Sequence, residues 1–180
     1  DSAIIYNTLT ENKYKINVLK KDYSYSEMCG NGCIALCLKF KKDLKIINSI
    51  NQITNVFYKD NKIVLQLNVR YLDNIFNVGG EKHKVYYVDK YDKKHHINIG
   101  QSNLPDYNTT FVFYNNNHYY FSTFERGVND ITKACGTGSF ASIYFINYNI
   151  DSNISRIKTL ENKDYIFSRD RNIFYLEYIV

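Results

Sequence analysis

Two stretches of the sequence repeat one pattern: MCGNG at residues 28–32 and ACGTG at residues 134–138. Each reads Cys-Gly-(Asn or Thr)-Gly, and each has an alanine six residues after its cysteine, at Ala35 and Ala141. Each also leads into an apolar segment that predicts a helix, at residues 34–42 and 140–148. One such motif alone would carry little information. Two in matched surroundings predict two similar lobes, each presenting a thiol at a helix N-terminus.

The remaining chain is rich in strand signals. Runs of β-branched and aromatic residues predict strands at residues 15–19, 56–58, 63–69, 85–88, 111–114, 119–124, 165–168 and 173–179. Polar turns at residues 59–62, 115–117 and 169–172 join neighbouring strands into hairpins. Because strands far outnumber helices, we expect an α+β fold with mixed or antiparallel sheet in the two similar lobes. We place the N-terminal lobe at residues 1–76 and the C-terminal lobe at residues 77–180.

The composition excludes several classes of protein. With 180 residues, 44% of them hydrophobic and 23% charged, the chain can form a packed core. The longest apolar runs, such as residues 34–38, are too short to span a bilayer, so we predict no membrane partner. The net charge of +5 is spread along the chain, and most aromatic residues alternate as in strands. A stacking surface for single-stranded nucleic acid is therefore the less favoured interpretation, and we predict no nucleic-acid partner.

The four cysteines do not form a metal-binding pattern. The sequence contains no CxxC pair, and its four histidines lie far from the group formed by Cys29, Cys33 and Cys37. We therefore predict no metal site. Cys33 and Cys37 are interpreted as small buried apolar residues. A reducing, cytoplasmic location is expected for this cysteine usage.

The paired loops have a specific chemical capacity. The positive end of the helix dipole predicts a lowered pKa for Cys29 and Cys135. The neighbouring glycines let backbone N–H groups approach a carboxylate closely. If two such termini face each other, one thiol can remove a proton from the carbon beside that carboxylate while the other returns a proton to the opposite face. This chemistry inverts a stereocentre and needs no pyridoxal phosphate, so we predict no cofactor.

The two motifs, together with FERGV at residues 124–128 and TKACGTG at residues 132–138, resemble the diaminopimelate epimerase family. The resemblance runs over essentially the whole chain. It implies two similar α/β lobes, each wrapped on a central helix, with the site between them. It also implies a two-cysteine epimerase that interconverts LL- and meso-diaminopimelate in lysine and peptidoglycan precursor biosynthesis. It also leads us to expect a homodimer. Asp1 aligns within the family's early segment, so we expect a processed or partial polypeptide whose first lobe lacks its start.

The resemblance also implies roles for individual residues. Cys29 and Cys135 match the catalytic thiol pair. Glu125 and Arg126 match the residues that read the amino and carboxylate groups at the distal end of the substrate, a task that suits an arginine fork. Asn108 matches a substrate-binding asparagine. The residues whose amides are implied to hold the α-carboxylate are Gly30, Asn31, Gly136 and Thr137.

At two substrate-binding positions the sequence departs from the family pattern. Lys20 and Glu81 stand where the family has substrate-binding asparagines, and each could contact a ligand or have a structural role. His83 is interpreted as structural. Asn108 could instead be only a turn residue. These departures keep two alternatives open: a related racemase or isomerase of another amino acid, and a catalytically retired homologue that only binds a ligand or partner.

Overall fold

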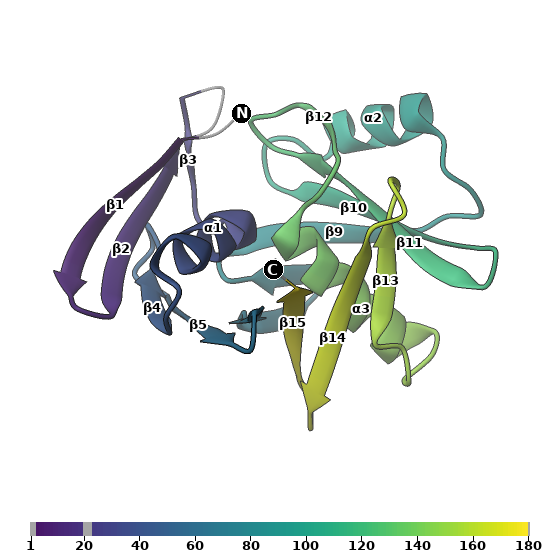
Figure 1. The fold of residues 1–180 in the computed structure, drawn as a ribbon. Coiled ribbons are helices and arrows are strands. Elements are labelled where there is room, and N and C mark those ends of the chain that lie inside the picture. The colour runs from purple at the N-terminus through teal and green to yellow at the C-terminus, as the bar shows by residue number, and fades with distance from the viewer. Residues whose placement is uncertain (1–2, 20–22, 180) are drawn as a thin grey trace.

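Helices α1 (Gly30–Phe40) and α3 (Gly136–Asn149) contact each other near the centre of the molecule, with strands around both of them (Figure 1). The computed structural model describes residues 3–19 and 23–179. The strands of the N-terminal half are β1 (Ala3–Thr10), β2 (Lys13–Leu19), β3 (Tyr25–Ser26), β4 (Leu44–Ile47), β5 (Ile53–Lys59) and β6 (Lys62–Gln66). The strands that follow are β7 (Val69–Leu72), β8 (Ile75–Val78), β9 (Glu81–Tyr87), β10 (Asn108–Asn115), β11 (His118–Glu125), β12 (Asp130–Thr132), β13 (Arg156–Thr159), β14 (Asp164–Asp170) and β15 (Ile173–Ile179). The predicted α+β fold class is confirmed.

Most of these strands form one hydrogen-bonded path, in the order β1-β2-β4-β5-β6-β15-β14-β13-β11-β10-β9-β8-β7. The path is mixed, since β2–β4, β9–β10 and β11–β13 are parallel and the other pairs are antiparallel. The two halves join where β6 pairs with β15, near the C-terminal end of the described chain. Strands β7 and β8 pair with β9 rather than with β6. The lobe boundary between residues 76 and 77 stays a prediction.

The three predicted hairpins are present, and their turns show why the sequence marks them. In the β5–β6 hairpin, Asp60 and Asn61 both have positive φ, at 50° and 56°. In the β10–β11 hairpin, Asn116 and Asn117 have φ of 47° and 61°. Asn and Asp tolerate this left-handed region better than other residues with a Cβ, and two such residues in succession match the twist of the flanking strands.

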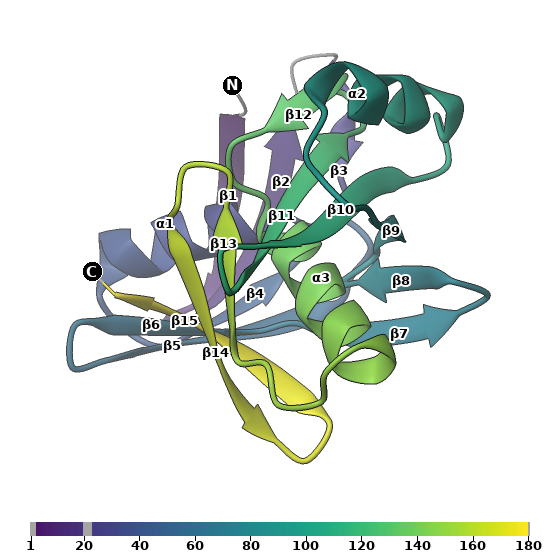
Figure 2. The same cartoon turned by 90° about the vertical axis from the view of Figure 1, so that its right-hand side faces the viewer.

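Both central helices begin four residues earlier than predicted, at Gly30 and Gly136 instead of residues 34 and 140. The prediction read the glycines as loop residues, because glycine disfavours helix interiors. A further helix, α2 (Lys93–Ser102), was not predicted, because only His96 and Gly100 of its residues are buried and it has no apolar stripe. It packs beside β10, β11 and β12, at the top of Figure 2.

The core fills the space between the central helices and the strands. Cys33 and Cys37 of α1 have no exposed surface and belong to this core, as predicted. In α3 the residues Phe140, Ile143 and Ile146 are also fully buried, which fixes the helix against the strands around it. None of the helices in the described part of the chain has the length and apolar character needed to cross a membrane.

Candidate active site

Cys29 and Cys135 are the N-cap residues of the two central helices. Each has an extended backbone, with φ of −136° and −130°. Each Sγ accepts a hydrogen bond from the backbone N–H three residues later, from Gly32 at 3.3 Å and from Gly138 at 3.2 Å. The sulfur therefore takes the place that a Ser or Asp oxygen usually has at a helix start. This capping explains why helices begin inside the Cys-Gly-(Asn or Thr)-Gly motifs, and the four cysteines are all free.

The two helix starts meet backbone to backbone. A Cβ added to Gly30 would lie 3.2 Å from the Cα of Gly136, and one added to Gly136 would lie 3.1 Å from the Cα of Gly30. The Asn31 side chain also crosses between the motifs, since its Nδ2 donates to the Ala134 carbonyl oxygen at 3.4 Å. The sequence raised a facing pair of motifs only as a condition for the two-thiol chemistry, and these contacts bring the two motifs together.

Both thiols line one cavity of about 440 Å³, which we call the two-thiol cavity. Its wall includes Glu125 and the residues of both motifs whose backbone amides are predicted to bind the α-carboxylate. It also includes the apolar side chains of Ile4, Val18 and Val128. The predicted residues in this wall are Cys29, Gly30, Asn31, Glu125, Cys135, Gly136 and Thr137. In the described residues, no group of three or more His, Cys, Asp or Glu side chains could hold a metal ion.

Burial raises the pKa of the Cys29 thiol above its usual value, and the Glu125 and Glu81 carboxylates raise it further. Burial raises the pKa of Cys135 even more, again with a contribution from Glu125. Hydrogen bonds from Gly32 and Gly138 oppose these shifts and are outweighed. The predicted lowering of both pKa values is therefore wrong in sign. Burial removes the water that stabilises a thiolate, and the hydrogen bonds at the helix N-terminus compensate for only part of that loss. With both pKa values raised, the thiol form of Cys29 and Cys135 is favoured over the thiolate at neutral pH.

A buried hydrogen-bonded chain lies behind Cys135. The Thr137 hydroxyl is 3.5 Å from the Cys135 sulfur and 2.9 Å from His83 Nε2. His83 Nδ1 in turn lies 3.0 Å from the Thr110 hydroxyl. His83 has no exposed surface. The sequence indicated a structural role for His83. It did not indicate that the Thr137 hydroxyl links His83 to the Cys135 thiol.

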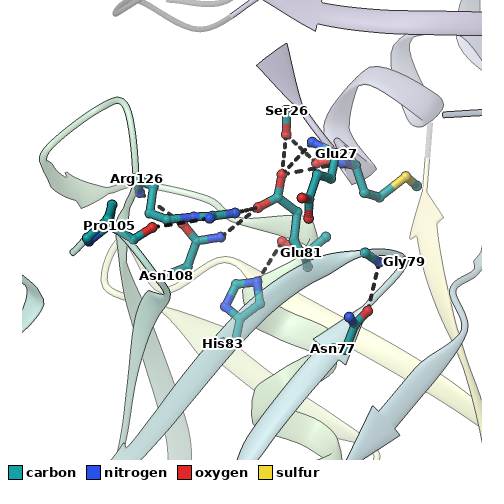
Figure 3. Close-up of polar contacts among 12 residues, drawn as sticks. Ser26, Glu27, Asn77, Gly79, Glu81, His83, Pro105, Asn108 and Arg126 are labelled. Atoms are coloured by element: carbon teal, nitrogen blue, oxygen red, sulfur yellow. Dashed lines mark hydrogen bonds and ion pairs between the residues drawn. The ribbon is translucent and has the colours of Figure 1, made fainter. Parts of the chain in front are cut away.

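Glu81 is a buried carboxylate, with 2% of its surface exposed, at the first residue of β9. Its Oε1 accepts hydrogen bonds from the Ser26 hydroxyl at 2.7 Å and from the backbone N–H groups of Glu27 at 2.8 Å and Met28 at 3.3 Å. Figure 3 shows these donors converging on the carboxylate. Glu81 therefore fixes the segment that leads directly into Cys29.

The other oxygen of Glu81 holds Asn108 and Arg126. Oε2 accepts from Asn108 Nδ2 at 3.2 Å and forms an ion pair with Arg126 Nη2 at 2.8 Å (Figure 3). Asn108 Oδ1 accepts from the Arg126 backbone N–H at 2.8 Å. The predicted substrate contacts Asn108 and Arg126 are thus bonded to Glu81, for which the sequence left a ligand contact or a structural role open. None of the three lines the two-thiol cavity. Lys20 lies outside the described residues.

Comparisons with known proteins agree with this fold. No family model matches the chain. A protein of Flavobacterium psychrophilum named diaminopimelate epimerase is 28% identical over 173 residues, which cover 79% of this chain and 63% of that relative. The chain thus spans less than two thirds of the length of the curated relative it matches.

Solved structures match over almost the whole chain. A putative phenazine biosynthesis PhzC/PhzF protein from Clostridium difficile has a TM-score of 0.65, with 98% of this chain and 78% of that one covered. A PhzF-family phenazine biosynthesis protein from Enterococcus faecalis has a TM-score of 0.62 over 98% of this chain and 78% of that one. One from Bacillus anthracis has a TM-score of 0.61 over 98% and 80%. Each is 10% identical, so these structures show that the fold is shared.

Proposed function

We propose that this chain is a cofactor-independent isomerase that inverts an α-carbon beside a carboxylate, with Cys29 and Cys135 as its two acid–base groups. One observation carries the proposal: two thiols cap two helices whose first turns are in backbone contact, and both thiols line one cavity. The epimerase name of the Flavobacterium relative is consistent with this chemistry.

The helix starts supply the binding site for the carboxylate. The first N–H groups of a helix have no carbonyl partner within it, and they carry the positive end of the helix dipole. The first-turn residues Gly30, Asn31, Gly136 and Thr137 bring two such ends to the cavity wall. When the α-proton leaves, negative charge spreads onto the carboxylate, and the same N–H groups stabilise it there.

The proton transfer conserves the total charge of the site. The thiolate form of one cysteine takes the α-proton and becomes a thiol, while the thiol of the other cysteine gives its proton to the opposite face and becomes a thiolate. The roles are exchanged after each turnover. Because both pKa values are raised, the active form with one thiolate is a minor species at neutral pH.

An α-amino acid is the proposed class of substrate, and diaminopimelate is the first one to test. The resemblance of the two motifs and the name of the Flavobacterium relative support this choice. The bonding of Arg126 and Asn108 to Glu81 favours instead an isomerase of another amino acid.

Proton NMR in D₂O with the reduced protein tests the proposal. Loss of the α-proton signal of an amino acid, together with appearance of the opposite stereoisomer, is the expected result. Absence of exchange on LL-diaminopimelate and on a panel of other amino acids would contradict the proposed isomerase.

A further inference from the structure

The Cys29 thiol is carried by a short connector. Strand β3 ends directly before residues 27–29, and helix α1 begins directly after them. The backbone N–H groups of Glu27 and Met28 donate to Oε1 of Glu81 at 2.8 Å and 3.3 Å. The connector that leads into the thiol is therefore held by one buried carboxylate.

The second oxygen of Glu81 binds the segment that follows Glu125. Oε2 accepts from Asn108 Nδ2 at 3.2 Å and from Arg126 Nη2 at 2.8 Å. Asn108 Oδ1 also accepts from the Arg126 backbone N–H at 2.8 Å. Arg126 comes directly after Glu125, which ends β11 and lines the two-thiol cavity. Glu81 thus lies between the Cys29 connector and the end of β11 (Figure 3).

The loop that leads into Cys135 has a similar anchor. Thr132 stands three residues before Cys135, and its hydroxyl donates to Oε1 of Glu125 at 2.6 Å. Ser26 stands at the same place before the first thiol, and its hydroxyl lies 2.7 Å from Oε1 of Glu81. Each thiol loop therefore meets one glutamate through a hydroxyl at the same position, which indicates that the two glutamates have corresponding roles.

We propose that Glu81 is a positioning residue, which holds the Cys29 thiol in place within the two-thiol cavity by bridging the Cys29 connector and the end of β11. Glu81 acts through these hydrogen bonds and is not part of the cavity wall. A buried carboxylate with donors on both oxygens forms a stiff bridge, because loss of either set of donors leaves a buried charge less well paired. The inference rests on the proposed function in taking Cys29 as an acid–base group of the reaction.

Two variants test this role, since each removes a different property of Glu81. Glu81→Asp keeps the carboxylate but is one methylene shorter, so it cannot reach both sets of donors. Glu81→Gln keeps the length but turns an NH₂ group toward one set. For the amino acid that the wild type isomerises, we expect kcat for α-proton exchange to fall at least about tenfold in both variants, with KM within about threefold of wild type. An unchanged kcat in both folded variants would overturn the inference, and so would a raised KM with unchanged kcat, which would place Glu81 in substrate binding.

Asp164→Asn is the matched control for a general loss of stability. It removes a carboxylate that is paired with Lys158 at 3.0 Å and is not part of the cavity wall. A lower melting temperature is expected in all three variants, whereas only the two Glu81 variants should lose kcat. An equal loss of kcat in Asp164→Asn would mean that stability alone is responsible, and it would overturn the inference.

Hydrogen exchange of the backbone amides tests the bridge without any activity. By NMR of the wild type, the Glu27 and Met28 amides are expected to exchange at least about a hundredfold more slowly than amides of an unstructured chain. In Glu81→Asp, these two amides and that of Arg126 should lose protection together. Unprotected Glu27 and Met28 amides in the wild type would overturn the inference, even if neither Glu81 variant folds.

These measurements separate the inference from the proposed function. A wild type that exchanges no α-proton contradicts the isomerase, while a joint loss of amide protection in Glu81→Asp would still support the bridge to Cys29. Full exchange activity in both folded Glu81 variants supports the isomerase and overturns the positioning role.

Discussion

Gly30 and Gly136 lie so close that a side chain on either would press on the backbone of the other: a Cβ on one would be 3.1–3.2 Å from the Cα of the other. Neither glycine needs a positive φ, so their role is to allow close approach and not an unusual backbone conformation. The distance between the two thiols therefore depends on two residues that carry no functional group.

Replacing Gly30 with alanine is expected to push the two helix starts apart by a few tenths of an ångström. Because proton transfer is sensitive to the placement of the reacting groups, the rate of exchange should fall roughly tenfold or more. Gly32→Ala is the matched comparison, since its Cβ would meet the flexible tip of Ile4 at 3.3 Å and the Cys29 side chain at an ordinary contact distance of 3.5 Å, but no backbone atom of the other helix start. Exchange rates and melting temperatures of both variants measure the difference. Equal losses in the two variants would show that the backbone contact is not what matters.

Substitution of the two cavity cysteines should lower activity, whereas substitution of the two core cysteines should lower stability. Cys29→Ala and Cys135→Ala are each expected to lower isomerase activity by about a thousandfold or more, since each removes one of two required acid–base groups. Cys33→Ala is the control, because Cys33 lies on the same helix, is fully buried and is not part of the cavity wall. It should keep most of the activity and lose stability. Full activity in a Cys135→Ser variant would exclude the two-thiol mechanism.

The features that the sequence predicted well are those encoded within a few neighbouring residues. The thiol at each helix start follows from a five-residue motif, and the hairpins follow from pairs such as Asn116 and Asn117. The start of α1 was misplaced because a cysteine cap cannot be recognised until its sulfur is seen to accept from Gly32.

The features that the sequence could not reveal depend on residues brought together from distant segments. Glu81 meets Ser26 and Arg126, which lie 55 and 45 positions away along the chain. The sequence showed that Glu81 departs from the family pattern. It did not show which residues Glu81 contacts. The sign of the thiol pKa shift also depends on burial, and burial of Cys135 is a property of the packed structure alone.

Thr137→Val should disconnect His83 from Cys135. The hydroxyl that links them at 2.9 Å and 3.5 Å is lost, and a buried nitrogen of His83 loses a hydrogen-bond partner. We expect a loss of about 1–3 kcal/mol in the free energy of unfolding. The Thr137 hydroxyl also lowers the pKa of Cys135, so the pH dependence of exchange should move to higher pH. Thr137→Ser restores the hydroxyl and should restore the profile. An unchanged pH profile in Thr137→Val would mean that the hydrogen bonds among Cys135, Thr137 and His83 contribute only to packing.

The buried thiols should make the fold less stable in alkali. Burial raises the pKa of Cys33 well above 9.0 and that of Cys37 to about 11. Above pH 9 the unfolded chain releases these protons while the folded chain keeps them, so the free energy of unfolding falls as pH rises. The stabilisation is complete below pH 9 and is lost through about pH 11 for Cys37 and beyond for Cys33.

Urea denaturation of wild type and Cys33→Ala at two pH values measures this effect. Between pH 9 and pH 10 the wild type should lose about 1 kcal/mol more than the variant, because only the wild type has the Cys33 thiol. Tyrosine and lysine titrations are common to both chains and cancel in the difference. Parallel pH slopes would contradict a raised pKa for Cys33.

Glu125 is expected to hold back ionisation of both cavity thiols, since its carboxylate raises the pKa of Cys29 and of Cys135. In Glu125→Gln both pKa values should fall, so more thiolate is present at mildly alkaline pH. Iodoacetamide should then alkylate Cys29 about two- to tenfold faster, because the thiolate is the reactive form. Peptide mass spectrometry follows Cys29 separately from the buried cysteines. Glu161→Gln removes a carboxylate that is paired with Lys133 and has no part in either thiol's pKa shift, so it should react at the wild-type rate. Slower alkylation in Glu125→Gln would mean that Glu125 favours the thiolate, which is opposite to the charge arrangement of this cavity.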